Sequence, residues 1–184
     1  MRVFLDFEAS SLRKNGYPIE VGWVFEDGTS ENHLIRPAPD WSEWDPKAEA
    51  VHGIGRAELE AQGEPHDTVA RLMVDSLAPY RLYASAPSWD GKWLSLLLRS
   101  AGLPRHALRL QDTEEAQFES AAEILQAAFP GEDPTPLVLN LMAQVREEGE
   151  KRTVRHRAVA DAQEELRRCR EVVRLATELA QGLG

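Results

Sequence analysis

The first forty residues alternate between apolar runs and short polar turns, a pattern that predicts β-strands. The expected strands cover residues 3–7, 17–25 and 33–36. An Asp27-Gly28 pair separates the last two, which is typical of a tight hairpin. Short apolar segments at 81–84 and 108–110 predict two further strands.

From residue 56 onward, apolar residues recur every three or four positions, which predicts amphipathic helices. The expected helices cover residues 56–61, 67–78, 115–129, 136–147 and 157–179, and one more begins near Pro87. Residues 37–50 hold three prolines and are expected to form a loop, in which Trp41 and Trp44 either contact a substrate or pack within the loop itself. The order of elements indicates a three-layer α/β fold with a mixed sheet.

A chain of 184 residues is long enough to bury a complete core, so we expect one domain spanning residues 1–184. The single cysteine, Cys169, excludes an internal disulfide and a multi-cysteine zinc site, and its place in the apolar stripe of the last helix predicts a core position. No leader pattern and no apolar run of membrane-spanning length are present. We therefore expect a cytoplasmic protein with no membrane partner.

The formal net charge of −10 counts against tight, nonspecific binding of long nucleic acid, because such affinity comes mainly from Lys and Arg that neutralise phosphates. One basic run, KRTVRHR at residues 151–157, stands against this trend. It is either a local phosphate contact or a solvated loop.

Two carboxylates, Asp6 and Glu8, stand at the end of the first expected strand. Side chains two residues apart on a strand point to the same face, so they are expected to project together. Open α/β folds place their ligand crevice at this end of the strands. A hard divalent ion such as Mg²⁺ or Mn²⁺ would keep both groups ionised. The alternative is a strand that runs into an acidic, solvated loop.

Three further polar residues stand at element junctions in the second half of the chain. Asp90 lies between an expected strand and helix, where it could also serve as a helix N-terminal charge. His156 and Asp161 are five residues apart, which does not place them on one helix face. We therefore expect His156 on the loop before the last helix and Asp161 in that helix's first turns.

Five segments in this order resemble the DEDDh 3′-5′ exonucleases of the ribonuclease H-like fold, a group that includes proofreading exonucleases, oligoribonucleases and ribonuclease T. The matching segments are FLDFEASSL at 4–12, PIEVG at 18–22, VHGI at 51–54, WDGKWL at 89–94 and HRAVADA at 156–162. Ala9 stands where the family often has Thr, and Ala86 where it often has Asn. All five catalytic positions of the family are present.

The resemblance implies a three-layer ribonuclease H-like fold, with a mixed five-stranded sheet and helices on both faces. It implies two divalent ions, Mg²⁺ or Mn²⁺, about 3.5–4 Å apart, held by Asp6, Glu8, Asp90 and Asp161. His156 would act as the general base, a task suited to a neutral imidazole. The reaction would release nucleoside 5′-monophosphates from the 3′ ends of DNA or RNA.

The resemblance also indicates which residues contact the substrate. They are Ala9, Ser10, Leu12, His52, Ile54 and Trp89. Leu12 would wedge against the terminal base, and the turn at 51–54 would pack against its other side. His52 could equally be a turn histidine bonded to the backbone. With so acidic a chain, short or single-stranded substrates are expected.

Two other functions remain open on the sequence alone. One is a catalytically retired exonuclease-like module that binds nucleic acid or a protein partner. The other is a subunit whose acidic surface docks a basic protein. All four carboxylates are retained, which favours the enzyme. The sequence does not distinguish DNA from RNA, because recognition of the 2′-hydroxyl depends on the shape of the pocket.

Overall fold

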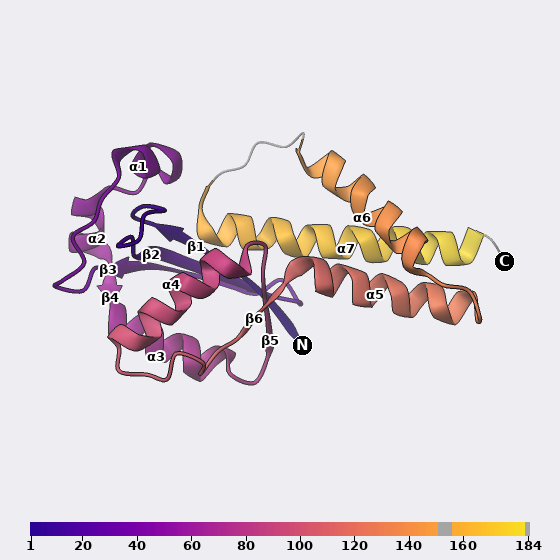
Figure 1. The fold of residues 1–184 in the computed structure, drawn as a ribbon, viewed down its shortest axis with the longest axis horizontal. Coiled ribbons are helices and arrows are strands. Elements are labelled where there is room, and N and C mark those ends of the chain that lie inside the picture. Colours follow the sequence, from indigo (N-terminus) through magenta and orange to yellow (C-terminus); the bar gives the residue numbers. More distant parts are fainter. Residues whose placement is uncertain (151–155, 183–184) are drawn as a thin grey trace.

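The computed structural model describes residues 1–150 and 156–182, which form a central sheet with helices on both faces (Figure 1). The strands are β1 (Arg2–Ala9), β2 (Pro18–Phe25), β3 (Ser30–Arg36), β4 (Glu64–Pro65), β5 (Arg81–Ala84) and β6 (Leu110–Asp112). The helices are α1 (Pro46–His52), α2 (Arg56–Gln62), α3 (His66–Leu77), α4 (Pro87–Ser100), α5 (Thr113–Ala128), α6 (Thr135–Glu150) and α7 (Ala158–Gly182).

The sheet is mixed, with the strand order β4-β3-β2-β1-β5-β6. β1 pairs antiparallel with β2 and parallel with β5. The described chain thus has six strands where five were expected, because the two-residue β4 is too short to carry a periodic pattern. The last strand also lies two residues later than predicted, since Leu108 packs into the core while Leu110 pairs with Leu82 of β5.

Alternation along β1 divides its side chains between two cores. Val3, Leu5 and Phe7 join the main core, which α3 and α4 cover on one face of the sheet. Phe4 points to the other face, where it packs with Tyr83 of β5 and with residues of α7, Cys169 among them. Asp6 and Glu8 lie two and four residues after Phe4 on the strand, so their side chains point to the same face as Phe4, toward α7. The predicted core position of Cys169 is confirmed.

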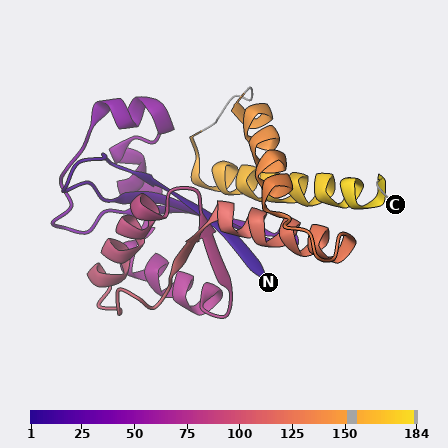
Figure 2. The ribbon, with the colours of Figure 1, turned by 45° about the vertical axis from the view of Figure 1, so that its right-hand side comes forward.

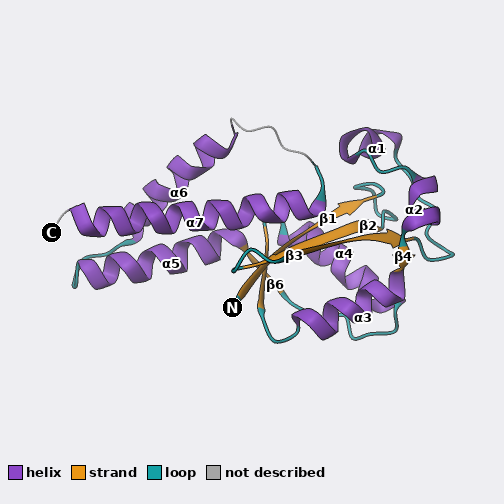
Figure 3. Ribbon diagram, turned by 180° about the vertical axis from the view of Figure 1, so that it is seen from behind, coloured by secondary structure: helices purple, strands orange, loops and turns teal. Residues whose placement is uncertain are grey.

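Helix α7 extends past the edge of the sheet, and its C-terminal half packs there with α5 and α6 (Figures 1 and 2). A separate apolar cluster, which includes Leu125, Met142 and Val172, joins these three helices. Seen from behind, the N-terminal end of α7 lies close to the tip of β1 (Figure 3). The long helix is thus anchored at both ends, and its first turn is held beside the carboxylates.

The predicted loop at residues 37–50 is wrong in its second half, where α1 begins at Pro46. The side chain of Asp45 caps this helix by accepting a hydrogen bond of 2.9 Å from the N–H of Lys47, and proline suits the first helical position. Trp41 is buried and stacks on Tyr17, so it packs into the main core instead of within the loop. No helix in the described ranges is both long and apolar enough to cross a membrane.

Candidate active site

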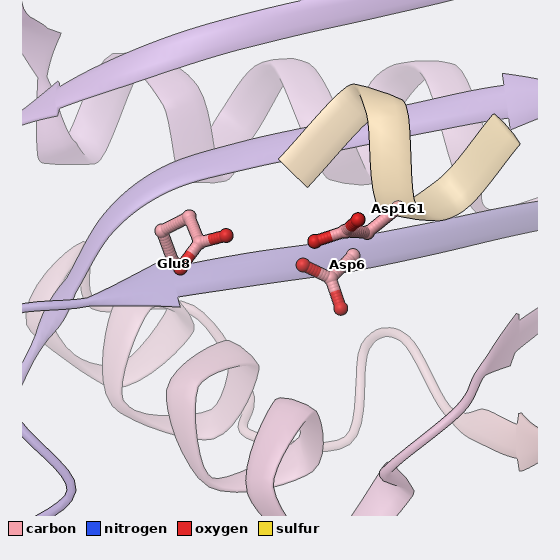
Figure 4. Close-up of side chains that lie close together, drawn as sticks. All are labelled: Asp6, Glu8 and Asp161. Atoms are coloured by element: carbon pink, nitrogen blue, oxygen red, sulfur yellow. The ribbon is translucent and has the colours of Figure 1, made fainter. Parts of the chain in front are cut away.

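Three carboxyl groups converge at the C-terminal end of β1 (Figure 4). Asp6 and Glu8 project from the strand, and Asp161 reaches them from the first turn of α7. One carboxylate oxygen from each of the three lies within 4.8 Å of the others. The expectation that Asp161 sits at the start of the last helix is confirmed, and the fold brings it across 153 residues of sequence to the strand.

The fourth predicted ligand, Asp90, lies outside this 4.8 Å group but belongs to the same electrostatic cluster. It stands in the first turn of α4, and only 3% of its surface is exposed. Its charge raises the pKa of Asp6, after the larger effect of burial. Its position near the helix N-terminus also fits a favourable interaction with the helix dipole, and the two roles are compatible.

The carboxyl groups are held in an environment that disfavours their ionised forms. Burial, followed by the charge of Asp161, raises the pKa of Glu8 to about 8. Burial raises the pKa of Asp90 to about 7, and burial together with neighbouring carboxylates raises that of Asp6 well above its ordinary value. A bound divalent cation removes this cost, and an all-oxygen donor set suits Mg²⁺ or Mn²⁺. The residues therefore fit the implied metal ions.

His156 lies two residues before α7, on the preceding loop as expected, and the residue is exposed. Its backbone φ of 40° is in the left-handed region, which few residues other than glycine adopt. Burial raises the pKa of Asp161, and the nearby charge of His156 opposes this increase. The histidine therefore lies close enough to Asp161 for their charges to interact.

Of the basic run at 151–157, the structure describes only His156 and Arg157. Lys151, Arg152 and Arg155 lie outside the described residues. Arg157 is paired with the buried Glu20 of β2, and its Nη2 donates a hydrogen bond of 2.5 Å to Glu20 Oε1. Arg157 is therefore committed to a structural partner, which weakens its predicted role as a phosphate contact.

A pocket of about 490 Å³ adjoins the carboxylates. Asp6, Glu8 and Asp90 line it, as do four of the predicted substrate contacts, which are Ala9, Leu12, His52 and Trp89. The other two predicted contacts lie elsewhere. Ser10 is buried, and its hydroxyl accepts a hydrogen bond of 3.1 Å from the N–H of Tyr17. Ile54 is buried in the main core because its turn points it inward.

The rim of this pocket carries exposed apolar side chains. Leu12 is 68% exposed and Trp89 is 42% exposed, both high for large apolar residues in a folded domain. Trp89 stacks on Trp93 with ring centroids 6.1 Å apart, and Lys92 Nζ lies 5.2 Å from the Trp89 ring centre. An apolar platform next to a carboxylate cluster suits a flat aromatic ligand such as a nucleobase.

His52 takes the structural role that the sequence offered as one alternative. Its Nδ1 accepts a hydrogen bond of 3.1 Å from the N–H of Ile54, which confirms a turn histidine bonded to the backbone. Burial lowers its pKa, so the ring stays neutral and Nε2 carries the proton. Nε2 is buried and has no hydrogen-bond partner within the described ranges. His52 lines the pocket as a residue, but Nε2 itself is buried away from solvent.

Sequence reasoning missed two buried glutamates near the cluster. Glu165 lies one turn after Asp161 on α7. Burial raises the pKa of Glu165, and the charge of Glu165 in turn raises the pKa of Asp6. Residues four apart on a helix lie on the same face, so the spacing from Asp161 could have indicated that Glu165 also faces the site. Glu20 lies directly opposite Glu8 in the β1–β2 register. Its part in the site depends on a contact with Arg157, 137 residues later, which no local pattern reveals.

No protein-family model and no curated protein matches the sequence. Solved structures do match it. Escherichia coli exonuclease I in complex with a dA16 oligonucleotide matches at 16% identity with a TM-score of 0.66, covering 99% of this chain and 42% of that one. The zinc-bound form of the E. coli exonuclease I–ssDNA complex gives the same values.

Exonuclease I from Methylocaldum szegediense matches at 15% identity with a TM-score of 0.65, covering 97% of this chain and 42% of that one. This chain thus spans less than half the length of these neighbours. At such low identity the likeness establishes the fold. The ribonuclease H-like fold that the sequence indicated is confirmed, and the chain is similar over nearly its whole length to a part of exonuclease I.

Proposed function

We propose that this protein is a metal-dependent 3′-5′ exonuclease of the DEDDh type, which releases nucleoside 5′-monophosphates from the 3′ ends of short or single-stranded nucleic acid. The observation that carries the proposal is the convergence of Asp6, Glu8 and Asp161 within 4.8 Å, beside a pocket with an aromatic rim. The fold shared with exonuclease I, whose structures include single-stranded oligonucleotides, adds support.

The four carboxylates would hold the metal ions. Asp6, Glu8 and Asp161 offer oxygens that already lie close together, and Asp90 lines the pocket together with Asp6 and Glu8. When bound, two divalent ions supply an activated water and stabilise the charge that develops on the leaving 3′-oxygen. Both Mg²⁺ and Mn²⁺ suit these ligands.

His156 would accept the proton of the attacking water. The imidazole of histidine is the side chain that most often serves as a general base in enzymes. Its exposure lets the proton pass on to solvent. His156 stands two residues before α7 and Asp161 stands in its first turn, so a proton acceptor and a metal ligand would approach the scissile phosphate from neighbouring positions in the chain.

The pocket would hold the terminal nucleotide. Trp89 offers a face for the base, Leu12 stands exposed at the rim, and His52 forms part of the pocket wall. Stacking of this kind accepts any base, because every base has an apolar face. A splayed terminal nucleotide is easier to obtain from a single strand than from a duplex.

The test uses purified protein with matched DNA and RNA oligomers, labelled at the 5′ end in one set and at the 3′ end in another. Degradation from the 3′ end predicts a ladder from 5′-labelled strands and immediate release of labelled mononucleotide from 3′-labelled ones. Mg²⁺ and Mn²⁺ are compared with excess EDTA. The Asp161→Asn variant serves as the control for a contaminating nuclease.

Each outcome decides a part of the proposal. Activity that survives in EDTA, or in Asp161→Asn, contradicts it. Binding of the oligomers without cleavage in either metal indicates the retired module instead. The ratio of DNA to RNA cleavage identifies the substrate class.

A further inference from the structure

The proposed function rests on Asp161, in the first turn of α7, and on His156, two residues before the helix, yet the described residues next to this N-terminus provide no side-chain cap. The preceding residue is Arg157, whose side chain has no acceptor for the free N–H groups of the helix. Ser, Thr, Asp or Asn usually takes this position. The cap is supplied instead by Glu20 of β2, whose Oε2 accepts a hydrogen bond of 3.0 Å from the N–H of Ala158.

The same carboxylate also clamps Arg157. Nε of Arg157 lies 3.0 Å from each oxygen of Glu20, and Nη2 lies 2.5 Å from Oε1. Asn32 of β3 also donates a hydrogen bond of 2.9 Å from its Nδ2 to Oε1 of Glu20. Glu20 itself is fully buried. Burial alone raises its pKa, but the hydrogen bonds from Arg157, Asn32 and Ala158 outweigh burial and lower it.

A second feature of β2 lets α7 come this close. Gly22 lies opposite Asp6 in the β1–β2 register. A Cβ at Gly22 would stand 2.2 Å from the backbone nitrogen of Val159, which is a severe clash. The backbone of α7 therefore packs directly against β2 at Gly22, and Glu20 of β2 holds the N-terminus of the helix. The residues of α7 that make these two contacts, Ala158 and Val159, lie between His156 and Asp161 in the chain.

We infer that Glu20 is a positioning residue of the site: by capping α7 and holding Arg157, it sets the places of His156 and Asp161 relative to Asp6 and Glu8. Its position carries an energetic cost, because it places a second carboxylate directly opposite Glu8, and like charges at such positions are destabilising. A structural cap alone could have come from a serine or threonine at position 157, without this repulsion.

The test replaces Glu20 by Gln, which keeps the size but presents an amide NH₂ to the arginine. Partners that orient metal ligands typically contribute 10–100-fold to metal affinity or activity. We therefore expect Mn²⁺ affinity, measured by calorimetry without substrate, to fall by about 10–100-fold. In the cleavage assay kcat should fall by a similar factor while KM stays nearly constant, because the Leu12–Trp89 rim is untouched.

Two further variants separate positioning from stability. Val172→Ala, in the distant α5–α7 cluster, is the stability control and should lower the melting temperature without changing Mn²⁺ affinity or kcat. Arg157→Lys keeps the charge but loses the bidentate fork, so its kcat should lie between those of the wild type and Glu20→Gln. It also provides the test if Glu20→Gln does not fold.

The results are decisive in either direction. If Glu20→Gln and Arg157→Lys lower the melting temperature but leave Mn²⁺ affinity and kcat at wild-type values, Glu20 is a structural cap only and the inference is overturned. The calorimetric measurement needs no turnover. An inactive wild type would therefore refute the proposed exonuclease while leaving the role of Glu20 in the metal site measurable.

Discussion

Replacing Glu8 by Gln is expected to stabilise the metal-free protein at pH 8. Burial, with the charges of Asp161 and Glu20, raises the pKa of Glu8 from 4.5 to about 8. One pKa unit corresponds to about 1.4 kcal/mol, so ionising Glu8 in the fold costs up to about 5 kcal/mol. Solvent reaches part of this side chain and screens the charge, so we expect a gain of about 2–3 kcal/mol in the free energy of unfolding.

The sign of the pH dependence follows from proton binding. A carboxyl group with a raised pKa in the folded state binds its proton more tightly there than in the unfolded state, so the fold loses stability as pH rises from 4.5 to about 8. The Glu8→Gln variant lacks this loss. The gain should therefore be small at pH 5 and reach its full size at pH 8.

The measurement is urea unfolding in excess EDTA at pH 5 and pH 8. Glu123→Gln, an exposed position on α5, is the control and should leave stability nearly unchanged at both pH values. Adding Mn²⁺ at pH 8 should stabilise the wild type more than the variant, because the metal removes the same repulsion. A Glu8→Gln protein that is less stable than the wild type at pH 8 would refute the reasoning and mark the carboxylate as a structural hydrogen-bond acceptor.

Three further results are expected. His156→Ala should lower kcat by about 10²–10⁴, with a low plateau in a Mn²⁺ titration; recovery at high Mn²⁺ would make His156 a metal ligand. Trp89→Ala should raise KM for single-stranded oligomers, because stacking contributes about 1–3 kcal/mol per base, and an unchanged KM would remove Trp89 from the binding surface. Binding of single strands to catalytically dead Asp161→Asn, measured against salt, should give a shallow slope; a steep slope would reveal an extended phosphate track.

The local patterns of the chain determined most of its elements and four of the site carboxylates. An apolar run that ends in Asp-x-Glu fixes both the strand and the shared face of Asp6 and Glu8, since side chains on a strand alternate. The apolar stripe of the last helix likewise indicated where Asp161 would stand. These are short-range properties, and the sequence displays them directly. The helix at α1 was missed even though Asp45-Pro46 is a good start signal, because the prolines around it favoured a loop.

Only the tertiary structure decided which distant residues complete the site. It buried Ser10 and Ile54, which the motif pattern had assigned to the substrate, and it brought Glu20, Arg157 and Glu165 beside the carboxylates. Arg157 appeared in the sequence as part of a basic run, and the fold turned it into the partner of a buried glutamate. The physical reason is that pairing across more than a hundred residues depends on how β2 and α7 pack, and the close approach at Gly22 that permits it has no signature in the chain around either partner.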